Sequence, residues 1–269
     1  MGRVLYRAVE RLGSNMIRLW SEAASFASYL ASIAGSFRSL RVIRLRFLRN
    51  IILNQARFTG IDALPFLIIV AMLVGGVVIV QGITNLPKFG IEGYFSNLLV
   101  IIIARELGPL ITALIVISLS GTAMSAQIAT QKWSREILSL EMAGIDPCLY
   151  ILVPRIAAST ISIFSLIIFF DMAAFLGGYL ISLTSVYTPL DTFFWNLAMA
   201  FSLKDLLATV IKSLIFGILI PLISYYYGMK PRSKFEIPIY VSRAVSRTLF
   251  SVVVLNVAVS ILFYFSWLE

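Results

Sequence analysis

Long apolar runs, each sufficient for a membrane crossing, recur along the chain. The first run, residues 64–83, contains 20 uncharged residues, and a helix needs about 20 residues to cross a hydrocarbon core of ~30 Å. Four further runs follow at residues 98–128, 150–183, 205–227 and 248–268. The third run exceeds one crossing, so we expect one end to project from the membrane or the helix to bend. The pattern predicts an all-α integral membrane protein with five transmembrane helices.

The chain before the first run is basic and amphipathic. In residues 1–35, four arginines fall on one helical face, opposite an apolar face, at about 100° per residue. This pattern is typical of a helix lying on a membrane surface, and a packed soluble helix is the alternative. Arginines continue from Arg38 to Arg57, which favours an elbow at the lipid headgroups. We therefore divide the chain into interfacial and elbow helices at residues 1–57 and a membrane domain at residues 58–269.

Basic residues are distributed unevenly between the runs. Ten arginines precede residue 64, whereas the loop expected at residues 184–203 contains no basic residue. The segment after the fourth run contains five basic residues, namely Lys230, Arg232, Lys234, Arg243 and Arg247. Because cytoplasmic segments carry an excess of Lys and Arg, we expect a cytoplasmic N-terminus. Five crossings then place the C-terminus on the other side of the membrane.

Composition agrees with a membrane chain. Hydrophobic residues make up 59% of the sequence and charged residues 13%, whereas soluble domains carry roughly 25% charged residues. The net charge of +9 then marks cytoplasmic and headgroup-facing segments, and nucleic acid is not an expected partner.

Several kinds of chemistry are excluded by the residues that are missing. Histidine is absent and Cys148 is the only cysteine, which excludes an intrachain disulfide, a metal centre of histidines or several cysteines, and a catalytic triad with a histidine base. The chain also lacks the Gly-x-x-x-x-Gly-Lys-Ser/Thr phosphate loop. We expect no catalytic residues, metal or cofactor in this chain. If the chain belongs to a transporter driven by ATP, the nucleotide site must lie on another chain.

Two adjacent charges, Arg105 and Glu106, lie within the second run and precede Pro109. Charged residues inside a membrane are costly and usually face a cavity or a partner. Pro109 offers no N–H to the Arg105 carbonyl, so we expect the helix to be kinked or locally opened there, with a polar backbone group exposed. A polar spot in a substrate cavity is one interpretation. A structural ion pair or an interfacial charge is the other.

Lys212 and Asp171 are the other candidate charges inside the membrane. Lys212 either meets Glu106 or extends its side chain to the headgroups. Asp171 is either neutral or hydrogen-bonded inside the bundle. Asp205 and Lys204 are expected to remain at the membrane interface.

A polar segment at residues 131–146 separates the second run from the third. It predicts a cytoplasmic, amphipathic helix between two spans, suited to docking an ATPase, and a solvated loop is the alternative. Its charged residues are Lys132, Arg135, Glu136, Glu141 and Asp146.

Several short strings occur in a specific order and spacing. They are F-T-G at residues 58–60, A-L-P at 63–65, R-E-L-G-P at 105–109, L-E-M-x-G-x-D-P at 140–147 and P-R at 154–155. They continue with I-K-S at 211–213, Y-G at 227–228, S-R-A at 242–244 and R-T at 247–248. Through these strings the chain resembles the MlaE (YrbE) permease family of bacterial lipid ABC transporters over roughly residues 58–265.

The resemblance implies a homodimer in the bacterial inner membrane, each subunit having an N-terminal interfacial helix, five spans and a periplasmic C-terminus. It implies as partners a dimer of cytoplasmic ABC ATPases, which would hold ATP and Mg²⁺, a hexamer of MCE-domain proteins and, in some systems, a STAS-domain protein. The implied cargo is a membrane lipid, with phospholipid the leading candidate, carried in support of outer-membrane lipid asymmetry.

Position by position, the resemblance also assigns a lipid cavity and a coupling helix. The cavity residues are Arg105, Glu106, Leu107, Gln81, Lys212 and Asn256. The coupling helix covers residues 131–147, with Arg135, Glu136, Glu141, Gly144 and Asp146 as ATPase contacts. Asn256 departs from the family pattern, because relatives commonly carry an aspartate at that place.

Two other functions remain open from the residues alone. One is an ion-coupled secondary transporter of a lipophilic substrate, with Glu106, Asp171 and Lys212 as coupling groups. The other is an intramembrane lipid-modifying enzyme that uses Glu106 or Asp171. Transport that requires an accompanying ATPase would argue against the secondary transporter. Lipid turnover by the isolated chain would be needed to support the enzyme.

Overall fold

A computed structural model describes residues 45–85, 88, 95–185 and 190–265. Every regular element in these residues is a helix. Five helical segments are long and apolar enough to cross a membrane: Ile51–Asn85, Asn97–Trp133, Cys148–Leu183, Leu203–Gly228 and Lys234–Phe263. The predicted all-α fold with five spans is therefore confirmed. The predicted surface helix at residues 1–35 lies outside the described residues.

The spans are built from consecutive helical pieces. The first contains α2 (Leu45–Ala56), the π-helical turn η2 (Arg57–Ile61) and α3 (Leu64–Asn85). The second contains α4 (Phe95–Leu99), η5 (Val100–Leu107), α5 (Gly108–Val116), η6 (Ile117–Gly121) and α6 (Thr122–Trp133). After α7 (Glu136–Met142), the third contains η7 (Cys148–Leu152) and α8 (Val153–Ser185). Then follow α9 (Leu190–Ala200), α10 (Leu203–Gly228), η8 (Lys234–Glu236) and α11 (Ile237–Phe265).

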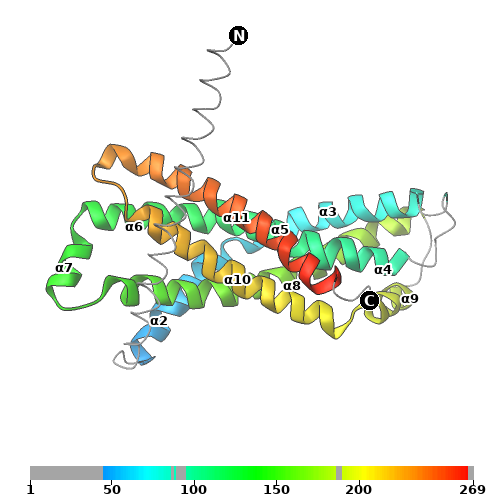
Figure 1. Ribbon diagram of the computed structural model, residues 1–269. Helices are drawn as coiled ribbons and strands as arrows, with labels where there is room; N and C mark the ends of the chain where they lie inside the picture. The colour runs from blue at the N-terminus through cyan, green and yellow to red at the C-terminus, as the bar shows by residue number, and fades with distance from the viewer. Residues whose placement is uncertain (1–44, 86–87, 89–94, 186–189, 266–269) are drawn as a thin grey trace, which may run out of the picture.

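The long helices lie side by side in an elongated bundle (Figure 1). The short helix α7 lies at one end of the bundle, and α9 lies at the opposite end (Figure 1). α8 packs against both α3 and α10, and α10 also packs against α6 and α11. α8 and α10 together therefore connect the other spans of the bundle.

Helices α3 and α8 approach so closely that their backbones touch. A Cβ atom on Gly75 would lie 1.9 Å from the Ala174 carbonyl oxygen, and one on Gly177 would lie 2.5 Å from the Met72 Cα. Small residues permit such contacts between membrane helices, where dispersion and backbone contacts stabilise the pair. α10 meets α8 in the same way, because a Cβ on Gly217 would lie 2.4 Å from the Thr160 Cα.

Two predictions about the ends of the spans and the segments between them are wrong. The fifth span begins near Ile237 and not at residue 248, so Arg243 and Arg247 lie within α11. An apolar run marks only the part of a helix that contacts lipid tails. Arginines can lie in the same helix near its end, because their side chains extend toward the headgroups. Residues 184–203, expected to be a loop, contain the helix α9. This helix has 11 residues, fewer than the ~20 needed for a crossing, so its apolar run is too short to be recognised as a span.

The polar segment at residues 131–146 is also not one helix. α6 continues to Trp133, and the chain then turns at Arg135, which has a φ of 63°, before α7 begins. A non-glycine residue in the left-handed region interrupts helical hydrogen bonding. The segment predicted to dock an ATPase therefore contains the seven-residue helix α7 with a turn on each side.

Candidate functional site

The regular α-helical hydrogen bonding of the second span is interrupted just before Pro109, as the sequence predicts. The residues before it form the π-helical turn η5, and the Gly108 N–H donates to the Ile103 carbonyl, five residues earlier. The Arg105 carbonyl instead accepts a hydrogen bond from Lys212 Nζ at 2.5 Å. A lysine from a different span thus satisfies the backbone group that the proline leaves free.

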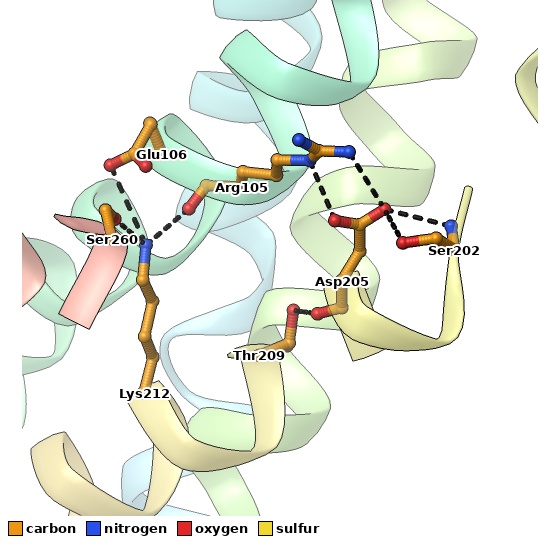
Figure 2. A network of polar contacts seen from close by, with 7 residues as sticks. All are labelled: Arg105, Glu106, Ser202, Asp205, Thr209, Lys212 and Ser260. Carbon is orange, nitrogen blue, oxygen red and sulfur yellow. Dashed lines mark hydrogen bonds and ion pairs between the residues drawn. The ribbon is translucent and has the colours of Figure 1, made fainter. Parts of the chain in front are cut away.

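Lys212 lies at the centre of a buried polar cluster (Figure 2). Its side chain is 1% exposed, and Nζ lies 3.7 Å from the Glu106 carboxylate. Nζ also donates to Ser260 Oγ on α11 at 2.8 Å. The predicted meeting of Lys212 with Glu106 is confirmed, and the alternative, extension to the headgroups, is wrong.

Asn256 completes the cluster from α11. Its Nδ2 donates to Glu106 Oε2 at 3.0 Å, and the residue is 3% exposed. An amide supplies this contact without adding a negative charge, so the formal charges of Lys212 and Glu106 balance. The Glu106 side chain remains 38% exposed, and it therefore presents a carboxylate at the edge of an otherwise buried cluster.

A second ion pair fixes Arg105 beside the cluster (Figure 2). Arg105 Nε lies 2.7 Å from Asp205 Oδ1, and Nη2 donates to Oδ2 at 3.3 Å. Asp205 is 2% exposed and also accepts hydrogen bonds from the Ser202 N–H and hydroxyl at 2.9 and 3.0 Å. The two contacts between guanidinium and carboxylate fix the orientation of the Arg105 side chain and also balance its charge. The structural ion pair is thus the interpretation of Arg105 that the structure supports.

The remaining predicted cavity residues lie apart from these pairs. Leu107 is half-buried in η5. Gln81 is exposed near the end of α3, where its Oε1 accepts a hydrogen bond from Asn85 Nδ2 at 2.9 Å. Asp171 lies on α8 with its Oδ1 buried and without a hydrogen-bond partner among the described residues. Of the three candidate membrane charges, the structure brings Glu106 and Lys212 together and leaves Asp171 separate.

The predicted coupling residues gather around α7, at one end of the bundle (Figure 1). Glu136 begins the helix and accepts a hydrogen bond from Ser134 Oγ at 2.9 Å. Gly144 has a φ of +73° and ends it, and Asp146 Oδ1 accepts the Cys148 N–H at 2.9 Å. Beside the exposed carboxylate of Glu141, the apolar side chains of Leu138 and Met142 are exposed, Met142 to 76%.

Comparison with known proteins places this geometry in a family. The sequence model of the family described as Permease MlaE matches residues 52–262. The chain belongs to the MlaE permease family. The matched region contains the whole polar cluster, from Arg105 to Ser260, and the predicted resemblance is confirmed.

Relatives cover most of this MlaE-family chain. A probable ABC transporter permease protein of Rickettsia prowazekii is 26% identical over 225 residues, 84% of this chain and 85% of that protein. A probable ABC transporter permease protein of Synechocystis is 29% identical over 224 residues, 82% of each chain. The intermembrane phospholipid transport system permease protein MlaE of Haemophilus influenzae is 29% identical over 182 residues, 66% of this chain and 69% of that protein. The chain is thus a multi-pass ABC transporter permease.

Sequence reasoning missed one residue of this MlaE-type site. Asp205 was expected at the membrane interface, but it is buried against Arg105. A signal was present, because Ser202 and Asp205 have the spacing of a capping box, and both of its hydrogen bonds are formed at the start of α10. A capping carboxylate at the start of a span was an available partner for the unexplained arginine.

Proposed function

We propose that this chain is the membrane subunit of an ATP-driven phospholipid transporter. In this proposal it moves lipid between the bacterial inner membrane and a conduit of MCE-domain proteins, and it performs no covalent chemistry itself. The observation that carries the proposal is the Glu106–Lys212–Asn256 cluster, with an accessible carboxylate inside an apolar bundle. Polar groups in such surroundings suit the headgroup of a lipid whose tails contact the helices.

A second copy of the chain would complete the cavity beside Glu106. α11 has an apolar stripe at helical spacing, with Phe250, Val254, Val257 and Ile261 exposed to between 48% and 69%. Asn256 and Ser260 lie on a different side of the same helix, where they contact Glu106 and Lys212. Packing of two such stripes would enclose lipid tails between subunits and leave the carboxylates at the cavity wall.

ATP would act through α7. The sequence contains no phosphate loop, so the nucleotide and Mg²⁺ belong to a partner ATPase. α7 presents the exposed Leu138 and Met142 beside Glu136 and Glu141, at the bundle end opposite α9 (Figure 1). An exposed apolar pair surrounded by carboxylates suits a groove on a soluble partner, with an apolar centre and a charged rim. With this end in the cytoplasm, α9 and the end of α11 face the periplasm.

A conduit partner follows from the energetics of lipid tails. A two-chain lipid carries about 30 methylenes, and exposing them to water at ~0.8 kcal/mol each costs on the order of 20 kcal/mol. All regular elements of the described residues are helices, and none of them forms a separate domain that could enclose lipid tails. A hydrophobic conduit on another protein would shield the tails, and a hexamer of MCE-domain proteins serves this role in the proposal. A STAS-domain protein is a further proposed partner.

Purification of the tagged chain from its host in mild detergent, with mass spectrometry of the accompanying proteins and lipids, tests the proposal. We expect an ABC ATPase, an MCE-domain protein and phospholipid with the wild type. The double variant Glu136→Lys, Glu141→Lys should lose the ATPase and retain the lipid. The control Asp62→Lys reverses an exposed carboxylate between η2 and α3 and should retain both. A wild-type chain that is purified alone, yet moves lipid or ions in liposomes without ATP, would replace this proposal with the secondary transporter.

A further inference from the structure

A separate pocket lies between α8, α9 and α10. Its volume is about 540 Å³, within the ~300–1,000 Å³ typical of ligand pockets. None of the residues of the Glu106–Lys212 cluster line it. Its wall residues Met172 and Leu206 are 56% and 52% exposed, so the pocket opens on the side of the bundle. In a membrane-spanning chain, that side is reached by molecules dissolved in the bilayer.

One carboxyl group lies in this apolar wall. Asp171 lines the pocket, and its Oδ1 is buried without a hydrogen-bond partner among the described residues. The carboxyl packs against the second span, where a Cβ on Gly108 would lie 2.3 Å from Oδ1. Among the lining residues that the structure describes, Thr209 is the only other polar one, and its hydroxyl donates a hydrogen bond to the Asp205 carbonyl at 2.9 Å. A carboxylate in hydrocarbon is costly unless an opposite charge meets it.

The rest of the wall favours a cation as that partner. Three aromatic rings line the pocket, those of Phe175, Phe194 and Phe201. Phe175 and Phe201 meet edge to face, with centroids 6.1 Å apart. Aromatic faces attract ammonium groups, most strongly where water is excluded. No lysine or arginine is among the lining residues that the structure describes, so the wall offers no charge partner to a phosphate.

We propose that this pocket binds a lipophilic cation from the membrane, with its cationic group at Asp171 and its apolar body against the three phenylalanines. The site is separate from the Glu106–Lys212 cluster and does not depend on the direction or energy source of transport. Its natural occupant is an ammonium-bearing amphiphile, because a carboxylate, aromatic rings and aliphatic walls together match that chemistry.

Equilibrium dialysis of radiolabelled tetraphenylphosphonium tests the proposal. The full chain is used with the proteins that accompany it in mild detergent, and the anion tetraphenylborate serves as the matched probe. We expect saturable binding of the cation and no saturable binding of the anion. Asp171→Asn should weaken cation binding about tenfold or more, because it removes one desolvated opposite charge. Asp191→Asn, an exposed carboxylate in the first turn of α9, should leave binding unchanged.

Two further variants keep the test valid if Asp171→Asn does not fold. Ala198→Trp fills the pocket from α9 and should abolish cation binding. Phe194→Leu retains an apolar side chain but removes a ring, and it should weaken binding of the cation. Equal saturable binding of the anion, unchanged cation binding in folded Asp171→Asn, or unchanged binding in both Ala198→Trp and Phe194→Leu would each overturn the proposal. Failure of the proposed transport function would not overturn this proposal, because cation binding in the pocket does not depend on ATP.

Discussion

Lys212 Nζ donates a hydrogen bond to the Arg105 carbonyl oxygen over 2.5 Å, the backbone group that Pro109 deprives of its helical partner. One lysine therefore satisfies a break in the second span and holds Glu106 at 3.7 Å. The opening of the helix and the polar site are parts of a single arrangement, in which the fourth span stabilises the second.

Lys212→Met should destabilise the protein through the loss of this hydrogen bond. The buried Arg105 carbonyl would be left without a partner, which costs about 1–3 kcal/mol. We expect the melting temperature in detergent to fall by several degrees. The matched change Lys204→Met, at an exposed lysine on the same helix, should lower it much less. Equal shifts in the two variants would contradict this role of Lys212.

Arg105 and Asp205 should be strongly coupled. Removing one partner of a buried ion pair leaves an uncompensated charge, at a cost on the order of 3 kcal/mol. We expect Asp205→Asn and Arg105→Gln each to lower stability, and the double variant to lose clearly less than the sum of the two. A thermal double-mutant cycle measures this coupling. Additive losses would mean that the 2.7 Å contact contributes no coupling energy.

The contact between α3 and α8 should not tolerate one added methyl group. Gly75→Ala would place a Cβ 1.9 Å from the Ala174 carbonyl oxygen, so the two helices would have to separate. Overpacking of this kind costs about 1–3 kcal/mol or more. Gly121→Ala is the control, because its Cβ would meet Ile220 Cγ2 at 3.4 Å, an ordinary contact. Folded yield and melting temperature should fall for the first variant only.

Replacing Asp171 should restore stability that is lost when Gly108 is replaced. Gly108→Ala would bring a Cβ to 2.3 Å from Asp171 Oδ1, and we expect a lower melting temperature from this overlap. Adding Asp171→Ala removes the overlapping atom and should restore most of the loss. If the double variant is less stable than Gly108→Ala alone, the two residues are not in the contact described.

The sequence predicts the spans well because crossing a membrane demands a long apolar helix, and that demand acts locally. The opening at Pro109 was predictable for the same reason, since the missing N–H lies in the residue itself. The contact of Asn256 with Glu106 joins residues 150 positions apart, and no local pattern encodes such a distance. Only the family resemblance brought these two residues together before the structure was described.

The features that the sequence did not predict correctly also have physical causes. Asp205 was expected at the interface because the first turn of a span normally reaches the headgroups, but Arg105 gives it a buried partner. α9 is apolar but shorter than a crossing, so neither the apolar runs nor the charge pattern indicated it. Its apolar residues line a pocket together with α8 and α10, a contact between segments that the local sequence does not encode.

The most direct test of the account is transport by the complete assembly in liposomes. The permease, purified with its accompanying ATPase and conduit protein, is given fluorescent phospholipid and acceptor vesicles, with ATP or without it. We expect lipid transfer that requires ATP and that falls about tenfold or more in Glu106→Ala, which removes the headgroup contact, while Asp191→Asn transfers lipid normally. Transfer that needs no ATP, or that is unchanged in Glu106→Ala, would contradict the central claim.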